Sequence, residues 1–296
     1  MGVTEDGARS ARGRLELVFG VDAPRVPGGS VRTRLRHSLQ TPPLRVVRPF
    51  DLPRGGALVH LHNVSGGVLG GDRLDNEIRL EEGARVQVTT TGSTRVYRHR
   101  PEGPPAQQVT HYHVGPDALL EVLPDSLIPY AGSRYRQVTS YHLAPGAGLL
   151  AWELVTPGRE AHGERFAYDS LELQTTIHAG TVPLAIERMQ LEPVLRPLDS
   201  PLRLGRYGSF ATFYACRVGQ EAGTWPELEK LLGELAAERS EAGECVWGVS
   251  TLPAHGVVVR GLGVTQRKLA GGLPIFWSAA RKFLVGEEGI LPRKLY

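Results

Sequence analysis

The stretch VHLHNVSGGVLGGD, residues Val59 to Asp72, decides the fold class, because two pairs of glycines lie between segments that alternate like β-strands. The glycines are Gly66, Gly67, Gly70 and Gly71. Glycine pairs in a strand pattern mark a bulge, a tight corner or a place where another backbone approaches closely. The following run, RLDNEIRL, has apolar residues at every second position, as a strand does. The stretch therefore predicts a shaped corner between two strands.

A phosphate-binding loop is the main alternative for these glycines, since glycine-rich loops can present backbone N–H groups to anions. A P-loop requires Gly-Lys-Ser/Thr at the start of a helix, whereas Gly70-Gly71-Asp72 precedes a strand pattern. The carboxylate of Asp72 would also repel a phosphate. The sequence therefore disfavours nucleotide binding at this corner.

A weak internal repeat extends the strand pattern along the chain, in steps of about 27 to 34 residues. Its turns are Gly56-Ala57, Gly83-Ala84, Asp117-Ala118, Gly146-Ala147 and Gly180-Thr181, and the runs that follow them read LVHLHN, RVQVTT, LLEVLP, LLAWEL and VPLAIE. A strand–turn–strand unit cannot bury its apolar face alone, so successive units should stack on a shared core, as in β-solenoids. A plain antiparallel sandwich or meander has similar spacing, and the repeat leaves both architectures open.

Composition favours an all-β-dominated fold, because 36 Gly and 22 Pro in 296 residues imply many turns. We expect a flexible tail over residues 1–11 and a single β-rich domain over 12–296. Two helices are predicted in the C-terminal third. The first lies near 225–240, where Thr224-Trp225-Pro226-Glu227 forms a capping box, and the second near 274–285, beginning at Pro274.

Charge, cysteine content and hydropathy argue against nucleic-acid-binding, secreted and membrane-spanning proteins. The net charge of +3 is too small and too dispersed for a nucleic-acid-binding protein, and Arg32, Arg34 and Arg36 read as a solvated strand face. Cys216 and Cys245 form no CxxC motif, and no secretory leader is recognisable, so we expect a reduced, cytoplasmic protein. No apolar run approaches the roughly 20 residues of a membrane-spanning helix.

Histidine pairs are the first candidate metal ligands. His60 and His62, like His111 and His113, alternate along a strand pattern and so share one face. Such pairs can bind nickel, zinc or copper when a third ligand is supplied. Alternating histidines are more often a polar sheet face, however, and no cysteine or HExxH helix accompanies either pair.

Carboxylates are the second group of candidates: Asp72 with Asp75, Glu121 with Asp125, and Glu160 with Glu164. Paired carboxylates in a β-helix could hydrolyse glycosides or polyuronates, which defines one hypothesis, a carbohydrate-active enzyme. All four tryptophans lie in apolar patterns that indicate core rather than a sugar-binding surface. No Ser-His-Asp or Cys-His motif supports nucleophilic catalysis.

Two motifs in this order carry a resemblance to a known family. Ser65 to Asp72 reads SGGxxGGD, and Gly158 to Glu164 reads GRxxxGE. Pro43-Leu44-Arg45-Val46, Thr89-Thr90, Leu123-Pro124 and a terminal Pro292-Arg293 extend the match over most of the chain. With these residues the sequence resembles the UreD family of urease accessory proteins, also called UreH.

The resemblance implies a non-enzymatic scaffold that binds the structural subunits of apo-urease. Its implied companions are a UreF-type accessory protein and a UreG-type GTPase that carries nickel. Ni²⁺ would pass through this chain to the urease active site, in transit and without a permanently bound cofactor. The implied fold is a helix-like stack of strands with a pair of helices, in agreement with the repeat.

A route for Ni²⁺ needs scattered ligands, because a complete high-affinity site would trap the ion. Asp72, Glu121, Asp125 and Glu164 are therefore predicted to line the route, and His60 and His62 are further candidates. Structural roles are the alternative, since Asp72 could cap the glycine turn and Glu164 could pair with Arg159. The motif residues Gly66, Gly67, Gly70, Gly71, Gly158, Arg159 and Gly163 are predicted to be structural. A β-rich binding module without a metal role is the third hypothesis.

Overall fold

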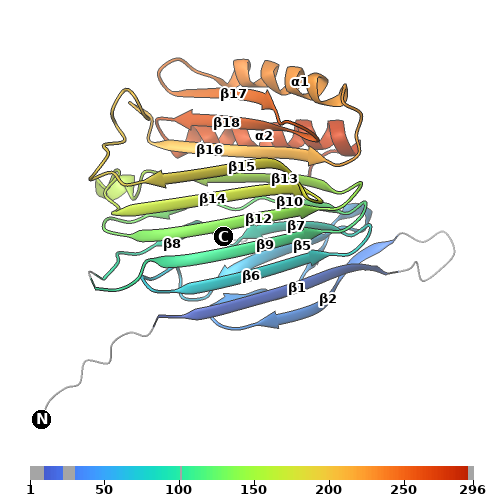
Figure 1. Cartoon of the computed structure of the whole chain (residues 1–296), viewed down its shortest axis with the longest axis horizontal. Coiled ribbons are helices and arrows are strands. Elements are labelled where there is room, and N and C mark those ends of the chain that lie inside the picture. The colour runs from blue at the N-terminus through green and yellow to red at the C-terminus, as the bar shows by residue number, and fades with distance from the viewer. Residues whose placement is uncertain (1–9, 23–30, 101, 293–296) are drawn as a thin grey trace, which may run out of the picture.

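The computed structural model describes residues 10–22, 31–100 and 102–292, and its strands form two facing sheets (Figure 1). Sheet I has seven strands, in the order β15-β14-β12-β9-β6-β1-β2. They are β1 (Arg12–Asp22), β2 (Arg32–Gln40), β6 (Arg73–Leu80), β9 (Ala106–Val114), β12 (Arg134–Leu143), β14 (Ser170–Ala179) and β15 (Val182–Leu191).

Sheet II has eleven strands, with the main order β17-β18-β16-β13-β10-β7-β5-β3. They are β3 (Leu44–Arg45), β5 (Ala57–Asn63), β7 (Arg85–Thr90), β10 (Leu119–Val122), β13 (Gly148–Val155), β16 (Ser209–Arg217), β17 (Cys245–Thr251) and β18 (Gly256–Gly263). The short strands β4 (Phe50–Asp51), β8 (Thr94–Val96) and β11 (Leu127–Pro129) are attached to its side. Single turns of 3₁₀-helix cover Pro53–Gly55 and Glu160–His162.

Apart from the short strands β8 and β11, the chain alternates between the two sheets from β5 to β14, so that each coil of the stack contributes one long strand to each sheet. Within sheet I, β1, β6, β9, β12 and β14 are parallel neighbours. Within sheet II, β5, β7, β10 and β13 are parallel neighbours. The parallel rows are flanked by the antiparallel strands β2, β15 and β16, and neither sheet closes on itself within the described ranges. The structure confirms the predicted solenoid-like stack.

The turns of the repeat lie on top of one another at one end of the stack. Gly83, Asp117 and Gly146 occupy equivalent left-handed positions, with φ of 68°, 53° and 73°. Their neighbours Ala84, Ala118 and Ala147 are all buried. A Cβ atom on Gly146 would lie 2.0 Å from Oδ1 of Asp117, which explains why glycine is required there. The glycine-alanine pattern therefore marks the corner of each coil.

The fifth repeat unit does not continue the stack, so this part of the prediction is wrong. The pair Gly180-Thr181 joins β14 to β15 as a two-residue loop, and the two strands are antiparallel neighbours in sheet I. A two-residue loop can connect only antiparallel strands, because a parallel crossover needs a much longer connection. The corner pattern alone does not distinguish a hairpin from a coil.

Two helices cover the end of sheet II, as predicted, but the second begins earlier than expected. Helix α1 spans Thr224–Arg239, close to the predicted 225–240. Helix α2 spans Gln266–Val285, so Pro274 lies inside it and does not begin it. Leu269, in the turns before Pro274, is fully buried against the sheet. This packing compensates for the hydrogen bond that proline removes from a helix interior.

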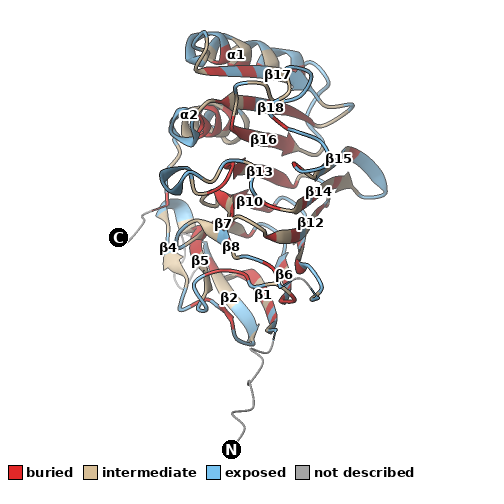
Figure 2. Cartoon of the chain, turned by 90° about the vertical axis from the view of Figure 1, so that its left-hand side faces the viewer, coloured by how far each residue is buried: buried red, intermediate tan, exposed pale blue. Residues whose placement is uncertain are grey.

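The described residues form two hydrophobic cores, one on each face of sheet II. The larger fills the space between the two sheets, and the smaller lies between sheet II and the helices. Figure 2 shows the buried strands in the middle of the stack, with α1 and α2 beside the upper strands of sheet II. No helix in the described ranges is long and apolar enough to cross a membrane. Residues 1–9 of the predicted tail lie outside the described ranges, and β1 begins at Arg12.

Candidate functional site

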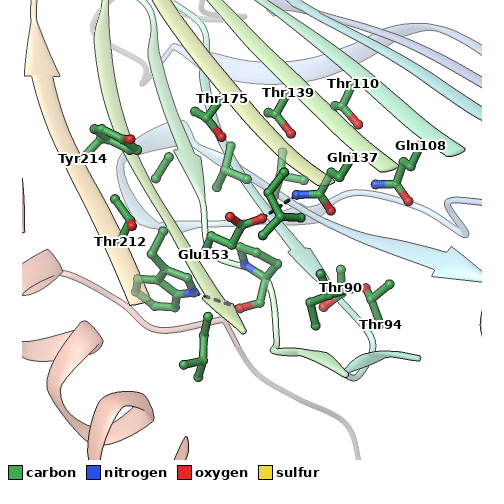
Figure 3. A pocket seen from close by; sticks show the side chains of 18 of the residues that line it. Thr90, Thr94, Gln108, Thr110, Gln137, Thr139, Glu153, Thr175, Thr212 and Tyr214 are labelled. Carbon is green, nitrogen blue, oxygen red and sulfur yellow. Dashed lines mark hydrogen bonds between the residues drawn. The ribbon is translucent and has the colours of Figure 1, made fainter. Parts of the chain in front are cut away.

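A cavity of about 120 Å³ lies between the two sheets, within the larger core, and its wall combines apolar side chains with a group of polar ones (Figure 3). Thr110, Thr139 and Thr175 form one row along its wall, because β9, β12 and β14 pair in register at these positions. Gln108 and Gln137 line the cavity from the same sheet. Polar side chains thus replace apolar ones at inward-facing positions of three successive coils.

Glu153 is the central ionisable group of this cavity. It projects inward from β13, and its Oε1 accepts a hydrogen bond from Nε2 of Gln137. The residue is partly exposed where it borders the cavity, but its carboxyl group lies deep in the fold. This desolvation raises the pKa of Glu153 to about 7, and the hydrogen bond from Gln137 opposes the shift. The carboxyl group can therefore gain or lose a proton near neutral pH.

A second carboxylate lines the cavity from β15. Glu187 accepts a hydrogen bond from the hydroxyl of Tyr214, and its Oε2 lies 3.6 Å from a guanidinium nitrogen of Arg260. Burial and the nearby charge of Glu187 raise the pKa of Tyr214 above its usual range, so the phenol stays protonated and donates. Glu153 and Glu187 were missed by the sequence analysis. The sequence feature that could have indicated Glu153 is an acidic residue at an inward-facing position of the alternating run LLAWEL.

Two further hollows share lining residues with the cavity, one at each side. One has a volume of about 270 Å³ beside the glycine corner and shares Leu61, Thr90, Thr94 and Gln108 with the cavity. The other has about 500 Å³ beside α2 and shares Pro124, Asp125, Trp152 and Leu154. Together the cavity and the two hollows form one zone, which is lined by both polar and apolar side chains.

Asp125 borders this zone, and His62 lies at its other side. The backbone N–H of Asp125 donates to Oγ1 of Thr90, at 2.9 Å. His60 and His62 are half-buried on β5, and desolvation followed by the charge of His60 lowers the pKa of His62. Among the described residues, no group of three or more His, Cys, Asp or Glu side chains is arranged to hold a metal ion.

The structure places Asp72 at the glycine corner, outside the cavity lining. Its Oδ1 accepts the N–H of Ala11 at 2.7 Å, and its Oδ2 accepts the N–H of Leu69 at 2.9 Å. The side chain is buried and caps the turn that precedes β6. At the same corner, a Cβ atom on Gly67 would lie 2.4 Å from the ring of Tyr97, so the glycine allows close packing.

We expect Asp72→Ala to lower the free energy of unfolding by about 1–3 kcal/mol, because the partly buried N–H groups of Ala11 and Leu69 would lose their acceptor. Urea unfolding of the wild type and the variant measures this change. Asp75→Ala is the matched control, since Asp75 is exposed on the next strand and its removal should change stability by about 0.5 kcal/mol or less. Equal effects of the two substitutions would contradict the capping role.

Glu164 is held within the GRxxxGE loop. Nε of Arg159 donates to its Oε2 at 2.9 Å, and the N–H of Ala131 donates to the same atom at 3.1 Å. These hydrogen bonds, that of Arg159 first, lower the pKa of Glu164 to about 2. The guanidinium of Arg159 also lies 4.2 Å from the ring centroid of Tyr130. Glu164 is thus a fixed, paired carboxylate outside the cavity lining.

Glu121 lies on the helix-facing side of sheet II. Its Oε1 accepts hydrogen bonds from Nε1 of Trp277 at 2.7 Å and from Nε of Arg281 at 3.1 Å, both on α2. Burial raises its pKa, and the charge of Arg281 opposes that shift. The structure therefore does not bring the four predicted carboxylates together, and of these four Asp125 lines the cavity.

The sequence model of the family described as UreD urease accessory protein matches residues 11–295. The chain belongs to the UreD family. A UreD urease accessory protein of Herpetosiphon aurantiacus is 47% identical over 283 residues, which cover 96% of this chain and 98% of the relative. The corresponding protein of Sorangium cellulosum is 33% identical over 277 residues, covering 94% and 82%. One from Deinococcus radiodurans is 38% identical over 187 residues, covering 63% and 64%.

Membership of the UreD family supports a role in urease maturation. The family is described as accessory, which fits a maturation factor better than the carbohydrate-active enzyme considered from the carboxylate pairs. The two motifs that carried the resemblance are now explained by packing, since SGGxxGGD forms a capped corner and GRxxxGE holds an ion pair.

Proposed function

We propose that this UreD-family chain is a non-catalytic scaffold for nickel insertion into apo-urease. In this proposal it binds the urease structural subunits and the UreF-type protein, and through that complex the UreG-type GTPase. Ni²⁺ is the cargo, and it travels through the interior of the stack without a resident cofactor.

The polar side chains of the cavity between the sheets, chiefly threonine, glutamine and glutamate, are the observation that carries this proposal. Their hydroxyl, amide and carboxyl oxygens can replace part of the hydration shell of a divalent cation. The groups are spread along successive strands and do not converge on one point, so they offer several weak contacts. Weak, repeated contacts allow an ion to enter and to leave, whereas a closed cage would retain it.

The protonation of Glu153 suits a transient contact. With a pKa of about 7, the carboxyl group is ionised in part of the molecules at neutral pH. An arriving cation favours the ionised form, and proton uptake weakens the contact again when the cation leaves. Asp125 on one side of the cavity and His62 on the other are the predicted groups nearest to the two ends of this route.

Co-expression tests the proposal. Urease structural subunits are produced with the UreF-type and UreG-type proteins, with and without this chain, and the nickel content and urea hydrolysis of the purified urease are measured. We expect nickel-loaded, active urease only when the chain is present. Equal loading without the chain would overturn the proposal, and a UreD-family relative expressed in its place serves as the positive control.

A further inference from the structure

Sheet II extends beyond sheet I at the helical end of the stack. β15 is the last strand of sheet I and pairs with β14, whereas sheet II continues past β16 to β18 and β17. The contact of Glu187 with Tyr214 places β15 opposite β16. Figure 2 shows β18 and β17 above the level of β15, with the helices on their other side. One side of this strand pair therefore has no opposing sheet.

The residues of β17 show which side is uncovered. Cys245 and Trp247 face the helices and are buried, whereas Val246, Gly248 and Ser250 alternate with them and are exposed. Val246 is 42% exposed, and Arg260 of β18, the register partner of Gly248, is also exposed. We call this uncovered side, together with the free edge of β15, the β15 shelf.

The edge of β15 differs from the opposite edge of the same sheet. On β2, Arg34 and Arg36 already pair with Asp51 and Asp22, so they offer no unpaired charge to a partner. On β15, Ile186 is 59% exposed. In the described part of the chain, the backbone of β15 makes no backbone hydrogen bond beyond its pairing with β14.

The surroundings of the β15 shelf carry arginines and exposed apolar side chains, beside the carboxylates of Glu192 and Asp199 in the following loop. Arg188 on β15 and Arg196 and Arg203 in the following loop are exposed, and none of them forms an ion pair with another described residue. Val194 and Leu202, in the same loop, are also strongly exposed. Carboxylates alternating with apolar side chains would complement this surface.

We propose that the β15 shelf receives an extended, acidic and apolar segment of a partner protein, which adds to sheet I as one more strand beside β15. The open strand edge supplies backbone hydrogen bonds, which a helix could not use because its own backbone groups are already paired. A carboxylate of the segment lies beside Arg188, and an apolar side chain lies beside Ile186. The partner belongs to the maturation complex, so this inference rests on the proposed function.

Hydrogen exchange of the full-length chain tests strand addition. Apo-urease and the UreF-type protein are added separately, and exchange is followed at the amides of residues 184–191. We expect one of the two proteins to slow exchange there at least tenfold, with no change at the amides of β2. Absence of protection with both proteins overturns the inference. If self-association of the chain, without either partner, slows exchange at these amides to the same extent, the inference is also overturned, since the added strand would then come from a second copy of the chain.

Substitutions identify the contact. We expect Ile186→Lys and Arg188→Glu to reduce capture of the protecting partner at least tenfold. Val47→Lys should not, because Val47 is an exposed valine in the turn between β3 and β4, far from the shelf. Urea unfolding confirms that each variant is folded. If Ile186→Lys leaves capture unchanged, the inference fails while urease activation still reports on the scaffold role. If the wild-type chain does not activate urease, the proposed function is overturned, and the inference that rests on it is overturned as well.

Discussion

Glu153→Gln is expected to stabilise the chain above pH 7 by about 3 kcal/mol relative to the wild type. Burial raises the pKa of Glu153 from 4.5 to about 7 in the folded state. Between these pH values the folded chain holds a proton that the unfolded chain releases, so wild-type stability falls as pH rises through this window. Glutamine does not ionise, and the variant therefore lacks this loss.

Urea unfolding of both proteins from pH 4 to pH 8.5 measures the effect. The two curves should agree near pH 4 and separate as pH rises to about 7. Glu82→Gln is the control, because Glu82 is exposed in the turn before β7 and its substitution should leave the pH dependence unchanged. If the stability of Glu153→Gln fell with pH as steeply as that of the wild type, another group would be responsible for the pH dependence.

The same variant also tests the route for Ni²⁺. If the ionised carboxyl group contacts the passing ion, Glu153→Gln lowers the nickel content of co-expressed urease although the chain itself becomes more stable. Loss of activation together with gain of stability separates a role in transport from a role in folding. Wild-type nickel content in the presence of Glu153→Gln would remove this residue from the proposed route.

Glu121→Ala is expected to lower the free energy of unfolding by about 2–3 kcal/mol, because Nε1 of Trp277 and Nε of Arg281 lose their acceptor inside the fold. Glu121 is 4% exposed, and its carboxylate accepts hydrogen bonds from both Trp277 and Arg281. Arg281 also lies 3.3 Å from Glu287, which pairs with Arg85 of β7. The network therefore fastens α2 and the segment after it to sheet II.

Urea unfolding measures this loss against Glu288→Ala, which removes an exposed ion pair with Lys282 and should leave the free energy of unfolding nearly unchanged. The double variant Glu121→Leu with Arg281→Met should recover much of the lost stability, since it leaves no buried charge behind. An effect of Glu121→Ala no larger than that of Glu288→Ala would contradict the role of the network.

The repeat in the sequence predicted a row of strand–turn–strand units, because corner residues and inward strand positions follow local rules, and the family resemblance favoured a stack over a sandwich. Gly83 and Gly146 have left-handed backbones that favour glycine, and the runs after them alternate with the period of a strand. The hairpin at Gly180 has the same local chemistry, and which strand it pairs with is decided by distant contacts. The early start of α2 also depends on tertiary packing, because the sheet buries Leu269.

The candidate site was less predictable from the sequence. Motifs drew attention to Asp72 and Glu164, and the structure gives both carboxylates hydrogen-bond partners that fix a loop. Glu153 and Glu187 lie in ordinary alternating runs without any motif. Their chemical interest comes from the space between the sheets, which forms only when strands distant in the sequence pack against each other.

The stacked corners at Gly83, Asp117 and Gly146 have a geometric consequence. Parallel neighbours lie about 4.8 Å apart, so the stack can be lengthened or shortened only in increments of that size, one whole coil at a time. A deletion of an odd number of residues within a strand would turn its remaining side chains to the opposite face, up to the next corner. The height of the stack is therefore set by the number of its coils.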